Sequence, residues 1–166
     1  MTDWSQLRAP WAGRWMQFMP VEAYPKPPAP LCYVVVLILN EQGQFLLANI
    51  RDRGYCVPSG RIEPGEAPEQ SARREAYEEA GAVLQELQLI GWYLLEPCSP
   101  KEPEPCASPV YLAHAEQVGL PEMPAESLGT HWATLDELPT LYYDWSPLLE
   151  AVFRYAWERS RTHGER

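Results

Sequence analysis

Apolar residues fall into short segments, and the longest unbroken group is the run YVVVLIL within residues 32–39. A continuous apolar run of this length, rich in valine, predicts a strand that is buried on both faces. A second strand is expected at 45–50, and the polar residues 40–44 between the two predict a hairpin. Three further segments have strand-like composition: 87–95, 109–116 and 128–134.

Two segments have the pattern of helices. The first is rich in Ala, Arg, Glu and Gln, with Pro68 suited to its first turn and Gly81 to its stop. The second begins at Pro147, with Ser146 as its expected N-cap. Its apolar face consists of Leu148, Leu149, Val152, Phe153, Ala156 and Trp157. Strands interleaved with two helices fit a sheet that is sandwiched between helices.

Prolines divide the chain. Six of the 18 lie in the first 30 residues and five lie between Pro97 and Pro109, which predicts irregular connections in both places. Aromatic residues of the first segment have roughly helical spacing that Pro10 interrupts, and we expect this arm to pack on the domain. A dimer contact or a substrate lid is the alternative. The predicted division is therefore an arm at 1–30, one domain at 31–160 and a polar tail at 161–166.

Charge and cysteine content limit the function classes. A formal net charge of −10 argues against binding of long nucleic acid, which needs a basic surface. No apolar run reaches the 18 to 20 residues of a membrane span, and we identify no signal peptide. The four cysteines form no C-x-x-C pair, so reduced thiols in a cytoplasmic protein are expected. A zinc site formed by Cys98, Cys106 and His114 is the alternative.

Three glutamates of the first helix predict a metal site. At about 100° per residue, Glu75, Glu78 and Glu79 fall on one face, with Arg74 at its border. Like charges at this spacing repel, and the helix dipole disfavours anions near its C-terminal end. A hard divalent cation would relieve both penalties. Mg²⁺ suits carboxylates together with water and substrate phosphate oxygens, with Mn²⁺ as an alternative.

Small residues and turns surround this helix. A stripe of Ala72, Ala76, Ala80 and Val83 is expected to pack on the sheet. Upstream, residues 55–60 predict a short strand that ends in a turn, and 63–66 predict a second turn. Glycine at 60 and 65 allows the backbone to approach a ligand closely.

The segment GRIEPGEAPEQSARREAYEEAGA at 60–82 resembles the Nudix box, G-x5-E-x7-R-E-U-x-E-E-x-G-U, in which U is a bulky apolar residue. The seven fixed positions all match: Gly60, Glu66, Arg74, Glu75, Glu78, Glu79 and Gly81. The departures are Ala76 and Ala82 at the U positions, and Ser59 where many members carry glycine. The chain is thus identified as a member of the Nudix (MutT-like) hydrolase family, and residues 31–160 as a Nudix domain.

This resemblance implies an α/β fold, the α/β/α sandwich with a mixed β-sheet. It implies that Glu75, Glu78 and Glu79 bind the metal, that the Gly60 carbonyl joins them, and that Arg74 pairs with Glu66. It also implies attack of water on a diphosphate linkage, for which a carboxylate must accept a proton. Either Glu78 or Glu79 could do so, and outside the box Glu126 is the first candidate. Glu102, Glu104 and Glu122 are weaker alternatives.

Substrate recognition is expected just before the last helix. The segment Leu141 to Trp145 occupies a region that lines the nucleobase pocket in relatives that cleave nucleoside triphosphates. Asp144 could bind a base edge while Tyr142, Tyr143 or Trp145 stacks on its face; the alternative is aromatic core packing with Asp144 favoured by the helix dipole. Pro97 lies 16 residues after Gly81, which resembles the spacing associated with ADP-ribose pyrophosphatases.

The expected function is therefore that of a Mg²⁺-dependent pyrophosphohydrolase that acts on a nucleoside triphosphate or oxidised nucleotide. A pyrophosphatase for ADP-ribose, a nucleotide sugar or a dinucleoside polyphosphate is the alternative. A non-catalytic nucleotide sensor is disfavoured because the box is intact. The expected partner is a small nucleotide, with no nucleic acid or membrane, and a homodimer remains open.

Overall fold

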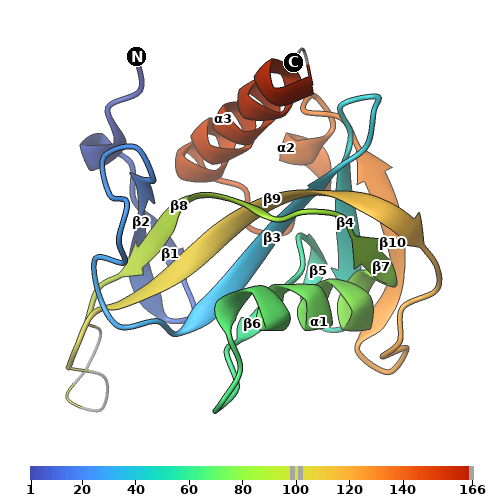
Figure 1. Ribbon diagram of the computed structural model, residues 1–166, viewed down its shortest axis with the longest axis horizontal. Helices are drawn as coiled ribbons and strands as arrows, with labels where there is room; N and C mark the ends of the chain where they lie inside the picture. The colour runs from blue at the N-terminus through green and yellow to red at the C-terminus, as the bar shows by residue number, and fades with distance from the viewer. Residues whose placement is uncertain (98–99, 101–102, 165–166) are drawn as a thin grey trace.

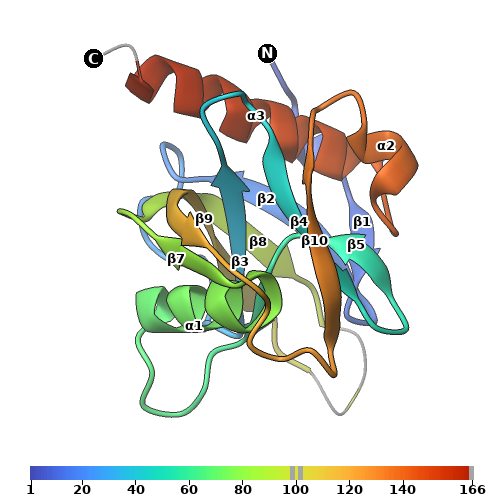
Figure 2. The same ribbon diagram turned by 90° about the vertical axis from the view of Figure 1, so that its right-hand side faces the viewer.

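A central sheet lies between two helical layers in the computed structural model, which describes residues 1–97, 100 and 103–164. Helix α1 (Pro68–Ala80) covers one face of the sheet. Helix α3 (Pro147–Gly164) crosses the other face, beside the short helix α2 (Leu138–Leu141) (Figure 1). The turned view in Figure 2 shows the same three layers. The predicted α/β/α sandwich is confirmed.

The sheet is mixed. Its strands follow the order β1-β2-β8-β9-β3-β4-β10, and β3 runs parallel to β9 while the other pairs along this path are antiparallel. The bounds of the path strands, in chain order, are β1 Ala9–Trp11, β2 Arg14–Pro20, β3 Tyr33–Leu39, β4 Phe45–Ile50, β8 Gln88–Leu95, β9 Cys106–Val118 and β10 Ser127–Ala133. Three short strands pair at its margins, β5 (Gly54–Cys56), β6 (Ser59–Arg61) and β7 (Ala82–Leu84).

Strand β3 explains why the chain needs an unbroken apolar run. Val35, Leu37 and Leu39 pack into the core on the α3 side of the sheet. Val34, Val36 and Ile38 alternate with them and pack with the alanines of α1 on the opposite side. Because successive side chains of a strand point to opposite faces, both halves of the run are buried. The prediction for this strand is confirmed.

The N-terminal arm differs from the prediction. Residues 9–20 form the hairpin β1–β2, and β2 pairs with β8 from Met16 to Pro20. Strand β1 is at the edge of the sheet. Proline has no backbone N–H, and an edge strand tolerates it because no strand lies on its outer side. A short 3-10 helix, η1 (Trp4–Gln6), precedes the hairpin. The aromatic spacing that looked helical thus belongs mainly to strands.

Other boundaries also moved. The expected strand at 55–60 is divided into β5 and β6 around Pro58. Helix α3 continues to Gly164, so the expected tail from residue 161 is helical as far as the structure describes it. Ser146 does cap α3, because its Oγ accepts a hydrogen bond from the Leu149 N–H at 3.2 Å. The division into arm, domain and tail stays a prediction. Among the described residues, no helix is long and apolar enough to cross a membrane.

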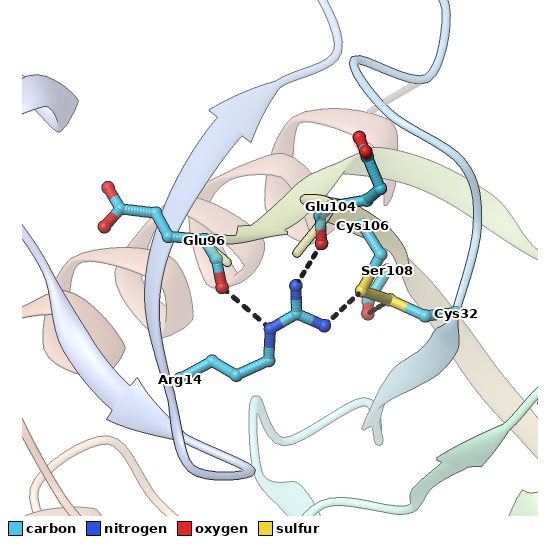
Figure 3. The surroundings of a disulfide bond; sticks show 6 residues. All are labelled: Arg14, Cys32, Glu96, Glu104, Cys106 and Ser108. Atoms are coloured by element: carbon cyan, nitrogen blue, oxygen red, sulfur yellow. Dashed lines mark hydrogen bonds between the residues drawn. A yellow bond between two sulfur atoms is a disulfide. The ribbon is translucent and has the colours of Figure 1, made fainter. Parts of the chain in front are cut away.

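The cysteines require a correction. Cys32 and Cys106 form a disulfide across 74 residues of sequence, whereas reduced thiols were expected (Figure 3). The parallel bridge between Leu31 and Ala107 brings the two cysteines together, a pairing that their spacing in the sequence does not reveal. Cys106 is therefore unavailable to the alternative zinc site, and Cys98 lies outside the described residues.

A buried arginine links this disulfide to the N-terminal hairpin. Arg14 Nε donates to the Glu96 carbonyl at 2.7 Å, and Nη2 donates to the Glu104 carbonyl at 2.5 Å. Its Nη1 lies 3.3 Å from the Cys106 sulfur (Figure 3). Arg14 is 8% exposed, so these contacts compensate a buried charge. They fix the turn of the hairpin against β8 and β9.

Candidate active site

The glutamate helix α1 is held by its alanines and its ends. Ala72, Ala76 and Ala80 are fully buried against the sheet. Gly81 ends the helix in the left-handed conformation with φ 63°, and its N–H donates to the Tyr77 carbonyl at 3.0 Å. Val83 is outside this stripe: it is exposed in β7. The small residues let α1 lie close to the sheet, which fixes the height of its carboxylates.

Arg74 is the centre of the charged network. Its Nε donates to Glu66 Oε2 at 2.7 Å, and its Nη1 lies 2.8 Å from Glu75 Oε1 and 3.3 Å from Glu78 Oε2. Its Nη2 also donates to the Arg61 carbonyl at 3.1 Å. The guanidinium thus ties the loop before the helix to two box glutamates, as the resemblance implied for Glu66.

Glu79 is set apart from this network. Its side chain is buried, and Oε1 accepts the Ser59 N–H at 2.9 Å. Gly60 follows directly, and a Cβ there would lie 2.1 Å from Glu75 Oε1. Glycine at position 60 is therefore required because the Glu75 carboxylate occupies that space. The β6 backbone and the two carboxylates are in direct contact.

Burial changes the acidity of these glutamates. It raises the pKa of Glu75 to about 7, with Arg74 opposing the shift. It raises the pKa of Glu79 to about 8, against the Ser59 hydrogen bond. The negative charge of Glu126 contributes to both increases. Glu66 is the opposite case, because hydrogen bonds from Arg74 and Ser71 lower its pKa to about 2.

The donor set fits a hard divalent cation. Three carboxylates share one helix; Glu79 is buried and Glu75 is half-buried, and burial raises the pKa of both. Oxygen ligands of this kind suit Mg²⁺ or Mn²⁺. In the described residues no three acidic, histidine or cysteine side chains converge on one point, since Glu75 and Glu78 turn toward Arg74 and Glu79 toward Ser59. Binding of a cation would require these side chains to turn away from those partners.

The loop before β10 brings Glu126 to the site. The Met123 N–H donates to the Glu78 carbonyl at 3.1 Å, and the Arg51 N–H donates to the Glu126 carbonyl at 2.7 Å. The Glu126 side chain is exposed. The negative charge of Glu126 raises the pKa of both Glu75 and Glu79. Glu102, the alternative in the proline-rich loop, lies outside the described residues.

A pocket with about 420 Å³ of space, part of it open to solvent, lies on the α3 side of the sheet. Ser59 lines this pocket and also binds Glu79 through its N–H. Arg53 and Cys56, which precede Ser59 in the chain, line the pocket as well. The negative charge of Glu79 raises the pKa of both side chains. The pocket and the box glutamates therefore meet at Ser59.

The segment before α3 forms one wall of this pocket. Tyr142, Tyr143 and Asp144 line it, and the Tyr143 N–H donates to the Tyr55 carbonyl at 3.1 Å. Asp144 Oδ1 is buried and has no hydrogen-bond partner among the described residues, and burial raises the pKa of this carboxyl group. The structure does not bring Trp145 to the pocket lining; its ring packs against Tyr142 at 5.7 Å and against Phe153.

Several pocket residues were not foreseen from the sequence. Arg53 and Cys56 precede the box without any motif, and Trp11 and Met16 come from the N-terminal hairpin. The position of Arg53, a cation next to a predicted short strand, was the one signal in the sequence that could have identified it. In the structure its guanidinium carbon lies 6.0 Å from the Tyr143 ring centroid. The hairpin residues had no such signal, because their position depends on the pairing of β2 with β8.

An α/β/α sandwich with a glutamate helix after a short strand that contains Gly60 defines a protein class. The NUDIX domain family model matches residues 30–154, and the chain belongs to this family. Enzymes of the family generally use a divalent metal and act on small nucleotides. The N-terminal hairpin lies outside the matched residues.

Individual relatives resemble parts of the chain. YtkD of Bacillus subtilis, provisionally named an 8-oxo-dGTP diphosphatase, is 45% identical over 59 residues, which are 36% of this chain and 37% of that protein. An RNA pyrophosphohydrolase of Photorhabdus laumondii is 40% identical over 58 residues, 34% of this chain and 33% of that protein. The chain thus matches only about a third of the length of these curated relatives.

Two solved structures share the fold over different parts of the chain. A Bacillus subtilis pyrophosphohydrolase has a TM-score of 0.70 at 23% identity, covering 95% of this chain and 98% of that one. A MutT NUDIX hydrolase from Burkholderia pseudomallei has a TM-score of 0.56 at 26% identity, covering 76% of this chain and 94% of that one.

Proposed function

We propose that this chain is a divalent-metal-dependent pyrophosphohydrolase that cleaves a diphosphate linkage in a nucleoside triphosphate or an oxidised nucleotide. The observation that carries the proposal is the continuity of the site: Ser59 contacts Glu79 on one side and lines the aromatic pocket on the other. A substrate with a base and a phosphate chain fits these two ends. Relatives that are named as an 8-oxo-dGTP diphosphatase, an 8-oxo-dGDP phosphatase and an RNA pyrophosphohydrolase support the reaction class.

The metal would be held by Glu75, Glu78 and Glu79, with the Gly60 carbonyl beside them, and Mg²⁺ is the ion that we propose. When bound, it supplies charge neutralisation at the phosphoryl oxygens and lowers the pKa of a bound water molecule. Arg74 positions Glu75 and Glu78 by its two contacts from Nη1. The Ser59 N–H holds Glu79 in the same way, and a bound cation would take the place of these contacts.

We assign the general base to Glu126. A base must be ionised and close to the water whose proton it accepts. Glu126 is exposed, and its carboxylate acts on those of Glu75 and Glu79 through charge. Water would attack phosphorus, the P–O bond of the anhydride would break, and the proton would pass to Glu126. Two phosphorylated fragments would leave.

The base of the substrate would lie in the aromatic pocket. Asp144 offers a buried acceptor without a partner among the described residues, which suits an N–H group of a nucleobase. Tyr143 lines the same pocket and is a candidate for stacking. Trp145 would act indirectly, by supporting Tyr142 from the core. Small nucleotides are the proposed partners, without nucleic acid or membrane, and a homodimer is not required by this site.

A substrate panel tests the proposal. Products would be measured with Mg²⁺, Mn²⁺ or chelator on ATP, GTP, CTP, their deoxy and 8-oxo forms, ADP-ribose, a nucleotide sugar and a dinucleoside polyphosphate. Metal-dependent cleavage with a preference for triphosphates is expected. A preference for ADP-ribose would establish the alternative substrate class, and binding without cleavage would establish a sensor. Gel-shift titration with single-stranded and duplex DNA is expected to show no complex.

The proposal includes a cytoplasmic location for the protein. A cytoplasmic location would match the nucleotide pool, and it was the expectation from the sequence. The Cys32–Cys106 disulfide is the observation against it, because disulfides are rare in reducing compartments. Fractionation of cells under thiol-blocking conditions would decide both the location and the state of this bond.

A further inference from the structure

The N-terminal hairpin contributes to the substrate pocket although it lies outside the matched family domain. Trp11 of β1 and Met16 of β2 line the pocket that also contains Asp144 and Tyr143. The family match begins at residue 30, so this wall lies outside the residues that the family model matches. A pocket wall outside the matched residues is a place where substrate selection can differ between relatives.

The position of Trp11 is fixed from two directions. Trp11 pairs with Arg14 across the hairpin, and Arg14 is anchored to the Glu96 and Glu104 carbonyls. The indole also packs on the Tyr33 ring at 5.1 Å and on the Tyr93 ring at 6.4 Å. A half-buried aromatic ring with these supports would lose little conformational freedom when a ligand packs on it.

The pocket also has features that point to a ligand. Asp144 Oδ1 is a buried acceptor for which the described residues provide no donor. Trp11, Tyr93, Tyr142 and Tyr143 give the same pocket aromatic walls. A planar ring that carries an N–H group would satisfy Asp144 and pack against the aromatic walls at the same time.

We propose that Trp11 is a specificity-determining residue, which packs on the base of the nucleotide while Asp144 binds an N–H group at the edge of that base. The proposal rests on the proposed function, since it takes the phosphate end of the substrate to lie at the box. It assigns the β1–β2 hairpin to base recognition. The phosphate chain would be bound without it.

The experiment compares Trp11→Ala with Trp15→Ala. Trp15 is the matched control because it belongs to the same hairpin and is 53% exposed. Its ring faces Arg8, 5.3 Å from the guanidinium carbon, and it does not line the pocket. Dissociation constants would be measured for the preferred triphosphate of the panel and for inorganic tripolyphosphate, which has no base. Metal would be Ca²⁺ if Mg²⁺ supports turnover.

Trp11→Ala is expected to weaken binding of the nucleotide by roughly 5- to 150-fold, the range for loss of a base–aromatic stack. Binding of tripolyphosphate should change by less than about twofold if only the base contact is lost. Trp11→Phe should recover most of the nucleotide affinity, whereas Trp15→Ala should leave both ligands unaffected. Circular dichroism and the melting temperature would confirm that each variant is folded, and Trp11→Leu would replace Trp11→Ala if the latter unfolds.

Equal weakening for both ligands would overturn the proposal, because Trp11 would then be a structural support for the fold. Unchanged nucleotide binding in Trp11→Ala, or wild-type protein that binds no nucleotide, would overturn it as well. The failure of the proposed function is a separate result: nucleotides would bind but not be cleaved, and the affinity comparison would still decide the role of Trp11.

Discussion

The backbone N–H of Ser59 donates to Oε1 of Glu79 at 2.9 Å, and this contact joins strand β6 to the buried end of the glutamate helix. Many family members carry glycine at this position, but the bond uses only the main chain, so serine preserves it. The same residue lines the aromatic pocket. Position 59 thus connects the part of the site that would hold phosphate to the part that would hold the base.

Loss of charge at the box glutamates should abolish most of the activity. Glu78→Gln and Glu79→Gln each keep the side-chain size but remove a carboxylate, and each is expected to lower kcat by about 10² or more, at least about 2.7 kcal/mol. Initial rates at saturating Mg²⁺ would measure this. Glu69→Gln is the control, since Glu69 is exposed in the first turn of the same helix. Near-normal turnover in both box variants would contradict the assignment.

Glu126→Gln should reduce kcat by roughly 10² with little change in KM, because a missing general base affects proton transfer more than binding. Glu122→Gln, in the same loop, is expected to retain activity, and Glu122 is also exposed. If Glu122→Gln has the larger effect, the base lies earlier in the loop.

Glu66 should give stability that depends on pH. Its pKa is lowered to about 2 in the folded protein from an ordinary 4.5, because Arg74 and Ser71 donate to the ionised form. The carboxylate therefore stabilises the fold fully above about pH 4.5, and this contribution is lost as the pH falls toward 2. The difference in urea midpoint between wild type and Glu66→Gln should shrink over that window. A difference that is constant from pH 6 to pH 3 would exclude an ionic origin.

The disulfide should contribute strongly to stability. Cross-linking residues 74 apart removes entropy from the unfolded chain, by about 3 to 5 kcal/mol in the loop-closure estimate. Reductant is expected to lower the free energy of unfolding of the wild type by this amount. It should have no further effect on Cys32→Ser, which already lacks the bond. Wild-type stability that does not respond to reductant would show that the two thiols are reduced, as their sequence spacing suggested.

Asp144→Asn should change base preference more than rate. The substitution exchanges one acceptor for a donor at the buried Oδ1 position while keeping the shape of the side chain. Ratios of kcat/KM among ATP, GTP, CTP, their oxidised forms and ADP-ribose would measure the effect. Asp136→Asn, at an exposed position before α2, is the control. Unchanged ratios would mean that Asp144 serves only the start of α3.

The sequence predicted the parts of the fold that depend on local patterns. The buried run of β3, the helix between Pro68 and Gly81, and the Ser146 cap follow from periodicity and end signals within a few residues. The Arg74 to Glu66 pair followed from the family pattern and is present at 2.7 Å. The roles of the box glutamates remain predictions that the variants above would test.

Features that depend on contacts between distant segments could not be predicted from local sequence patterns. The prolines within 9–20 predict an irregular segment, because a strand tolerates proline only at a sheet edge and no local pattern reveals which strand forms the edge. The Cys32–Cys106 pair depends on the parallel neighbourhood of Leu31 and Ala107. Trp11 reaches the pocket only because β2 pairs with β8. Each of these depends on partners that are distant in the chain.

The bond between Cys32 and Cys106 also turns residues 32–106 into a covalent ring that contains the whole segment 60–82. The two ends of the chain leave this ring at neighbouring points, because the two Cα atoms are 5.8 Å apart. A protease that cuts once inside the ring cannot release a fragment while the bond is intact. A nicked molecule would keep its full mass on a non-reducing gel, and its glutamate helix would stay tethered to both terminal segments.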